Sequence, residues 1–248
     1  MSPSRRPGAP SGAGHIPPCI LAVLLLSTPS AAEPSAAEPS TGVRTNTARL
    51  MGTDAAEVID APVLGLQRTA LPLFAGLAVD TSVYADVMLA PNVGLRWAMA
   101  AGPHRLVLGA RYTRFIGASV YSSIVESETP SIQRFEPELS GPSFYGVYGL
   151  ALGPLLVQGE ARYAHYTSDY LSFTGGVAFN FTGPWSVVGE AGVRVKGGAT
   201  LRAAAGLRYG GEHLGFGLGV TYVDLSDPAV PGEELPVLPV LDLSWTFR

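Results

Sequence analysis

A strict alternation of apolar and polar side chains is the feature that most constrains the fold. Residues 241–248 read Leu-Asp-Leu-Ser-Trp-Thr-Phe-Arg, so apolar side chains fall on one face and polar ones on the other. Because successive side chains of a strand point to opposite faces, this pattern predicts a half-buried strand that ends in aromatics. The pattern recurs along residues 155–224 in segments of about 9–12 residues, the length with which a tilted strand crosses a bilayer. The sequence therefore predicts an all-β, antiparallel transmembrane barrel.

The N-terminal residues 1–32 have the features of an export signal peptide. Arg5 and Arg6 give a positive start, residues 20–26 form a short apolar run, and small residues follow at the expected cleavage position. The apolar run is too short for a membrane-spanning helix. The single cysteine, Cys19, lies before this run, so we expect a mature chain without disulfides or a thiol nucleophile.

A leader is expected between the signal peptide and the barrel, over residues 33–68. Residues 33–47 repeat Ala, Glu, Pro and Ser, a composition with too little apolar surface to fold. Residues 48–59 could form a short helix, ended by Pro62, that lies against the barrel or partly inside it. The expected organisation is thus a signal peptide, a disordered or partly helical periplasmic leader, and a barrel over residues 69–248.

The charge balance argues against nucleic acid as a partner. The chain has a formal net charge of −4, and loss of residues 1–32 removes two arginines and no acid. A nucleic-acid-binding protein would be expected to carry a basic patch.

Tight turns and long loops alternate along the chain. Tight turns are predicted at Gly102-Pro103, Gly153-Pro154, Gly183-Pro184 and Gly210-Gly211, and the longest connection runs from Gly117 to Pro142. In outer-membrane barrels short turns gather on the periplasmic side and longer loops on the outside.

These four turns define eight strands, and the C-terminal strand, about 236–248, adds a ninth. Because bacterial barrels usually have an even number of strands, a further one is expected at Leu71–Asp80, before the strand Asp86–Ala100. The prediction is therefore about ten strands, with eight as the alternative.

The polar faces of the predicted strands mix Gly, Ala, Ser and Thr with single charges, unlike the Lys- and Glu-rich surface of a soluble barrel. This favours a polar inside and an apolar outside. Basic side chains outnumber acidic ones, which leaves two interpretations: a salt-bridged plug that fills the barrel, or a narrow pore that favours anions. The polar residues expected to face the lumen are Arg96, Arg111, Glu160, Arg162, Glu190, Arg194, Lys196, Arg202, Arg208 and Asp242.

Aromatic residues gather near the predicted strand ends, where amphipathic rings would meet the two membrane interfaces. The expected interfacial aromatics are Trp97, Tyr112, Tyr163, Phe181, Trp185, Tyr209, Tyr222, Trp245 and Phe247.

The export signal, the strands of 155–224 and the terminal Leu-x-Leu-x-Trp-x-Phe pattern together resemble the small outer-membrane β-barrel proteins of Gram-negative bacteria. The resemblance covers about residues 70–248 and is one of class. It implies a monomer in outer-membrane lipid, with a terminal strand that is read by the barrel-assembly machinery. Arg248 follows the terminal aromatic residue, which departs from that pattern.

Few residues suggest chemistry. His165 precedes Ser168 and Asp169, but alternation places His165 on the lipid side, and His-x-x-Ser differs from the His-x-Ser pattern of outer-membrane lipases. The acids of the long loop could bind a divalent cation or could form a solvated acidic surface. No spacing typical of a metal, nucleotide or phosphate site is present, so no cofactor or metal is expected.

The leading functional hypothesis is a non-enzymatic outer-membrane barrel with a largely plugged interior and a structural or surface-interaction role, exposing the loop Gly117 to Pro142. The first alternative is a narrow passive pore for small solutes. The second is a surface hydrolase that uses His165.

Overall fold

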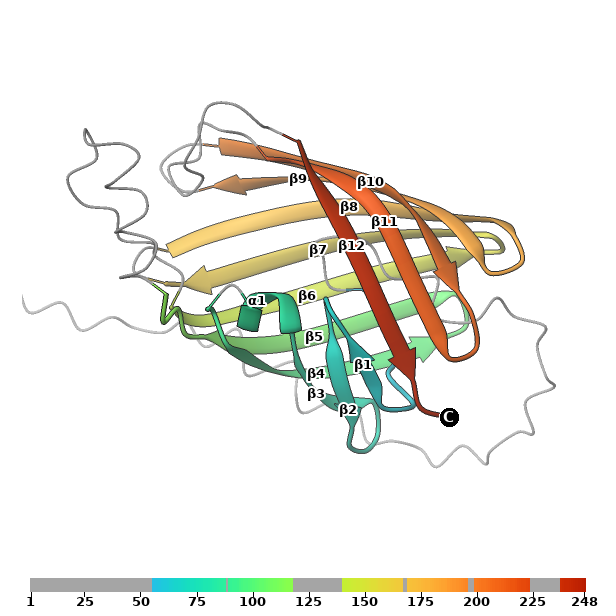
Figure 1. Cartoon of the computed structure of the whole chain (residues 1–248), viewed down its shortest axis with the longest axis horizontal. Coiled ribbons are helices and arrows are strands. Elements are labelled where there is room, and N and C mark those ends of the chain that lie inside the picture. The colour runs from blue at the N-terminus through green and yellow to red at the C-terminus, as the bar shows by residue number, and fades with distance from the viewer. Residues whose placement is uncertain (1–54, 88, 118–139, 167–168, 196–198, 224–236) are drawn as a thin grey trace, which may run out of the picture. The chain divides into compact units, whose positions relative to one another are not determined.

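In the computed structural model, the described residues form twelve strands that close into a single antiparallel barrel (Figure 1). Each strand pairs with its neighbours in the chain, and β1 closes the ring against β12. The structure describes residues 55–87, 89–117, 140–166, 169–195, 199–223 and 237–248. The predicted signal peptide, most of the leader, Ser168, Lys196 and nearly all of the loop Gly117 to Pro142 lie outside these ranges.

The elements differ strongly in length, because β1 to β3 have three to five residues and the other strands have 10 to 14. In chain order they are β1 (Val63–Gly65), β2 (Thr69–Pro72), β3 (Leu77–Thr81), α1 (Val83–Val87), β4 (Asn92–Ala101), β5 (His104–Thr113), β6 (Gly141–Leu152), β7 (Leu155–His165), β8 (Asp169–Thr182), β9 (Trp185–Val195), β10 (Ala199–Gly210), β11 (Leu214–Val223) and β12 (Val237–Thr246).

The predicted number of ten strands is wrong, as is the alternative of eight, because the N-terminal part of the barrel holds three short strands. The segment Leu71–Asp80 was expected to be one strand, but it reverses between β2 and β3. Ala75 and Gly76 make that turn with φ angles of 47° and 79°. The Gly-Pro and Gly-Gly pairs that mark the other turns are missing here, so an apolar run conceals the reversal.

The barrel also begins earlier than expected. Val63 pairs with Thr246, so β1 lies within the segment expected to be leader. The first and last strands of the barrel therefore pair with each other, through the three residues of β1. At the other boundary, α1 occupies the stretch around Asp86, and β4 starts only at Asn92.

The four predicted tight turns join β4 to β5, β6 to β7, β8 to β9 and β10 to β11. Gly102, Gly153 and Gly183 adopt φ angles of 58°, 58° and 47° in the first three, a conformation that costs glycine little. We call this side of the barrel the tight-turn end and the opposite side the loop end.

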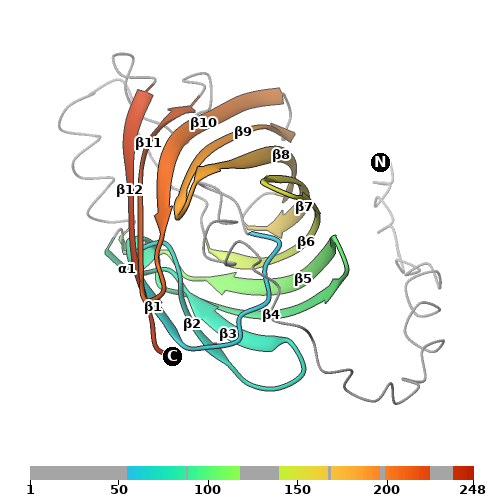
Figure 2. The same cartoon turned by 90° about the vertical axis from the view of Figure 1, so that its right-hand side faces the viewer.

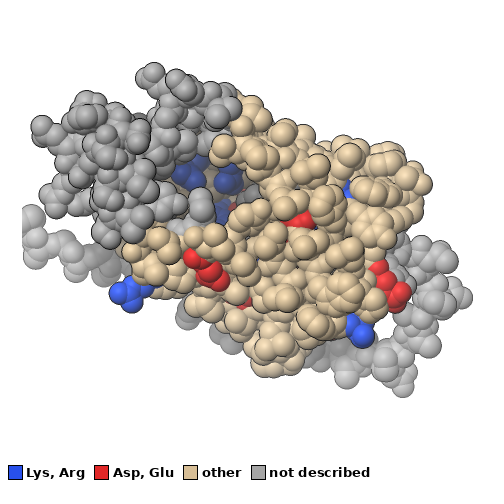
Figure 3. Space-filling view, in the orientation of Figure 1, with Lys and Arg blue, Asp and Glu red and all other residues tan. Residues whose placement is uncertain are grey.

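The apolar face of each strand points outwards. Leu201 and Leu218 expose 61% and 54% of their surface, whereas Arg96 and Asp242 are almost fully buried inside. Most of the outer wall in Figure 3 is uncharged. This inside-out pattern is what a barrel in lipid requires. No helix in the described ranges is long and apolar enough to cross a membrane.

The strands β1–β3 are too short to reach as far toward the loop end as the other strands do. The chain leaves β1 after Gly65 and turns back through residues 66–68 into β2. α1 follows β3 and is tied to that turn, since the Tyr84 backbone N–H donates to the carbonyl of Leu66 (2.9 Å). The short helix α1 therefore lies next to the β1–β2 turn, where the neighbouring strands β4 and β12 extend further toward the loop end.

Candidate functional site

The inside of the barrel is occupied at the tight-turn end by the segment that precedes β1. Figure 2 looks along the barrel and shows this segment, in blue, crossing the inside of the ring. Ala55 and Ala56 are fully buried, and Ile59 and Ala61 nearly so. We call residues 55–61 the plug segment.

Polar contacts attach the plug segment to the barrel wall. Arg96 on β4 donates from Nη2 to the carbonyl oxygens of Ala55 and Glu57, each at 2.9 Å. The Ala56 N–H donates to Oε1 of Gln158 on β7 (3.2 Å). Arg68 holds the Glu57 carboxylate at 2.6 Å. Each bond satisfies a group that would be costly to bury alone.

Apolar packing adds to these bonds. Ala56 packs in a cluster with Ala98, Val107 and Val147 from the wall. Gly149 on β6 makes this approach possible, because a Cβ at that position would lie 2.6 Å from the Ala56 Cβ. The plug segment thus fits a surface that a larger residue at Gly149 would destroy.

Two groups of ion pairs lie along the inner face of the wall, and each joins two strands across the strand between them. Asp80 on β3 accepts from Arg111 at 3.1 and 3.2 Å, with Arg68 at 3.8 Å. Asp242 on β12 accepts from Arg208 on β10 at 2.8 Å, and both side chains are almost wholly buried. Buried charges are tolerated only when paired in this way.

Three arginines gather toward the loop end of the lumen, and we call Arg162, Arg194 and Arg202 the arginine cluster. Arg162 donates to Glu160 at 2.8 Å and lies 4.8 Å from the ring centre of Tyr145. Arg194 lies 4.7 Å from the ring centre of Tyr170. The aromatic faces stabilise these cations without neutralising them.

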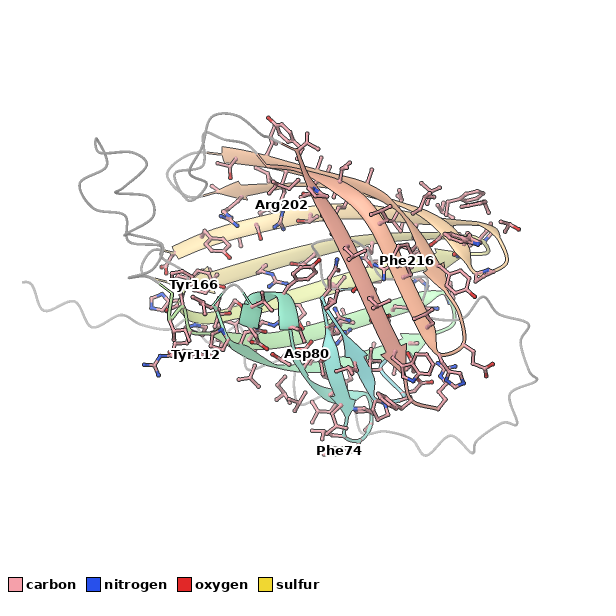
Figure 4. The ribbon with its side chains drawn as sticks, in the orientation of Figure 1. Phe74, Asp80, Tyr112, Tyr166, Arg202 and Phe216 are labelled. Carbon is pink, nitrogen blue, oxygen red and sulfur yellow. The ribbon has the colours of Figure 1, made fainter. Side chains whose placement is uncertain are left out.

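Arg202, unlike Arg162, has no carboxylate at ion-pair distance within the described ranges. Its Nη2 donates to the Thr174 hydroxyl at 2.8 Å, and its Nε has no partner there. Figure 4 shows Arg202 and Asp80 within the barrel, whereas Phe74 projects from the β2–β3 turn. An arginine with unused donors beside two further arginines is a ready site for an anion.

The structure brings most of the predicted lumen residues inside the barrel, and Lys196 lies outside the described ranges. Arg96, Glu160, Arg208 and Asp242 are buried, and Arg111, Arg162, Glu190, Arg194 and Arg202 are partly buried. Sequence reasoning missed five residues of this interior, which are Glu57, Arg68, Asp80, Gln158 and Thr174. Alternation could have found Gln158 and Thr174, since they share the polar faces of β7 and β8.

The predicted interfacial aromatics lie on the outside of the barrel. At the tight-turn end Trp97 donates to the carbonyl of Ala75 (3.1 Å), and Trp185 packs edge-on against Tyr209 at 5.3 Å. Tyr112, Tyr163 and Tyr222 are exposed nearer the loop end, and Phe181, Trp245 and Phe247 are exposed near the tight turns.

His165 lies on the outer face of the wall at the end of β7. Its Nδ1 is 2.5 Å from Oδ1 of Asp169, and both side chains are exposed. This pair lies away from the lumen, and Ser168 is outside the described ranges. The described residues contain no group of His, Cys, Asp and Glu that could hold a metal ion.

Comparison with known proteins identifies a likeness of fold. No protein-family model matches the chain, and no curated protein matches it. Among solved structures, the NanC porin matches with a TM-score of 0.49 and 10% identity, over 76% of this chain and 97% of the porin.

OmpT of Vibrio cholerae matches with a TM-score of 0.40 and 9% identity, over 73% of this chain and 63% of that protein. LpxR from Salmonella typhimurium matches with a TM-score of 0.38 and 12% identity, over 75% and 87%. At such identities the likeness concerns the barrel alone. The chain resembles outer-membrane β-barrel proteins in its closed antiparallel fold.

Proposed function

We propose that this protein is a non-enzymatic outer-membrane channel that admits small anionic solutes from the loop end, and that the plug segment closes it at the tight-turn end. In this account the signal peptide is removed, the tight turns face the periplasm, and the barrel acts as a monomer. The arginine cluster is the observation that carries the proposal.

The charge of the lumen at the loop end favours the entry of anions over that of cations. Arg162, Arg194 and Arg202 face Glu160 and Glu190 there, so positive charge is in excess. Rings of basic side chains favour anions in pores. Arg202 is partly buried and its Nε has no hydrogen-bond partner within the described ranges, so an anion bound there would satisfy a donor that is otherwise left unpaired.

The number of strands supports a lumen with room for solute. Barrel diameter grows roughly linearly with strand number, and about eight strands give an interior that side chains just fill. Twelve strands enclose a wider space, in which the plug segment occupies the tight-turn end. Movement of a segment that is attached mainly by hydrogen bonds would then open the passage.

Liposome swelling tests the proposal directly. Vesicles that contain the folded chain with Arg96→Met, which frees the plug segment, are diluted into gluconate, glucose or glucosamine, which have similar sizes and different charges. We expect gluconate to enter fastest and glucosamine slowest, and Arg202→Gln to reduce that difference. Equal rates for the three solutes, or faster entry of glucosamine, would contradict an anion channel.

The plug segment favours a second candidate, a permanently closed barrel with a structural role. Its burial and its bonds to Arg96 and Gln158 are those of a packed element. In that case none of the three solutes enters, and variants that loosen the plug segment unfold the barrel instead of opening it.

A further inference from the structure

The outer half of β12 has a free edge. β12 pairs with β11 from Val237 to Trp245, but its register with β1 covers only Ser244 to Thr246. Leu66 extends that contact by donating to the carbonyl of Leu243 (2.9 Å), and the chain then turns back into β2. Within the described ranges, no strand pairs with residues 237–241 on that side.

β12 contains a proline, Pro239, in the part that has no neighbouring strand, and proline is typical of edge strands. Leu243 and Phe247 direct backbone groups toward the β1 side, whereas Thr246 donates to His213 on the β11 side. The ring nitrogen of Pro239 therefore faces the free edge, because backbone groups alternate along a strand. Proline has no N–H to donate and is confined to edges of sheets, so its presence fits a missing neighbour.

The free edge lies at membrane depth. Val237 pairs with Tyr222, one of the exposed aromatics nearer the loop end, and Trp245, one of those near the tight turns, pairs with Leu64 of β1. Residues 237–241 therefore span the outer half of the bilayer. Unpaired backbone is not tolerated against lipid, but it is tolerated where it lines a wet cavity. The free edge thus borders an opening into the lumen.

The rim of this opening is apolar and its floor is basic. Leu238 faces inward by alternation with Asp242, yet it is 46% exposed. On α1, which Leu66 ties to β12, Tyr84 and Val87 are also exposed. Figure 3 shows a hollow beside β12 with basic side chains at its bottom. Arg202 is close to this rim, since Ala204, two residues along β10, pairs with Thr221, which pairs with Leu238.

We propose that the gap between β12 and α1 is a lateral opening through which a single-chain amphipathic carboxylate passes between the lumen and the outer leaflet. Its carboxylate binds Arg202, beside Arg162 and Arg194, and its alkyl chain lies against Leu238 and α1. This inference rests on the proposed anion site and names the class of solute that the site takes.

Charge and shape favour this occupant over a partner strand. A strand added to β12 would satisfy the edge at Leu241 and Val237, but it would gain no bond at the Pro239 nitrogen. It would also leave Arg202 without an anion. An amphipathic anion matches both the exposed apolar rim and the basic floor.

Quenching of a site-specific fluorophore tests the opening. The full chain carries Cys19→Ser and a single bimane-labelled cysteine, either Leu238→Cys at the rim or Leu218→Cys as a matched control. Leu218 lies on the neighbouring β11, pairs with Leu241 and faces lipid. The protein is placed in phosphatidylcholine nanodiscs at alkaline pH. The quenchers are spin-labelled stearic acid and its uncharged methyl ester.

We expect the acid to quench the Leu238 label several-fold more than the ester does, with no difference at Leu218. Arg202→Gln should remove the excess at Leu238, in protein whose heat-modifiable migration proves the fold. Equal quenching by acid and ester at Leu238, or an excess of acid at Leu218 as well, overturns the lateral opening. Faster entry of gluconate than glucosamine in the liposome-swelling assay shows that the anion channel stands even then, and loss of that preference removes both proposals.

Discussion

Replacing Arg96 by methionine should release the plug segment and open the lumen. Arg96 donates two hydrogen bonds to the carbonyls of Ala55 and Glu57, each at 2.9 Å. A hydrogen bond to a charged group contributes about 1.5–3 kcal/mol, so their loss weakens the attachment by about 3–6 kcal/mol. Since about 1.4 kcal/mol is tenfold in an equilibrium constant, the unplugged fraction should rise at least about 100-fold.

Single-channel recording in planar bilayers measures this fraction as the probability that the channel is open. Arg105→Met is the matched control, because it also removes one lumen cation near the tight-turn end. Arg105 makes no hydrogen bond or ion pair within the described ranges. If Arg96→Met folds normally and yet opens no more often than Arg105→Met, the plug segment does not control passage.

Two further variants test other parts of the interior. Gly149→Val should displace the plug segment by steric overlap, since a Cβ there would lie 2.6 Å from the Ala56 Cβ, and it should raise the open probability although Arg96 itself is unchanged; an unchanged open probability would contradict the packing. Asp242→Ala should cost about 3–5 kcal/mol of unfolding free energy by leaving the Arg208 charge buried, whereas the double variant Asp242→Leu with Arg208→Met should cost much less. Urea unfolding monitored by tryptophan fluorescence measures both, and equal losses would refute the pairing.

Alternation was enough to predict the strands from β7 to β11, because each shows an apolar and a more polar face, and it predicted β12 from its second half, residues 241–246. It failed at β1–β3, which have three to five residues, too few for a period of two to stand out. Ala75 and Gly76 form a turn without the usual dipeptide, so the reversal there was invisible.

The partners of the interior charges could not be predicted, because they depend on register across several strands. Arg208 and Asp242 come from β10 and β12 and are joined across Gly217 of β11, which pairs with both residues. The spacing of these residues along the chain does not indicate that Arg208, Gly217 and Asp242 lie side by side. The plug segment overlaps the stretch 48–59, which was expected as a short helix against the barrel or partly inside it. Residues 55–59 do lie inside, but they form no helix. Their exact place is decided by Arg96 and Gln158 on distant strands, which the local sequence does not reveal.

The excess of arginine in the outer lumen is the central claim, and the reversal potential in a potassium chloride gradient tests it most directly. The measurement uses the folded full chain with Arg96→Met, so that the lumen is open, and compares it with the same chain that also carries Arg202→Gln. The account predicts a reversal potential of the sign for chloride selectivity, shifted toward zero by Arg202→Gln. A potential of the opposite sign, or one that Arg202→Gln does not move, would contradict it.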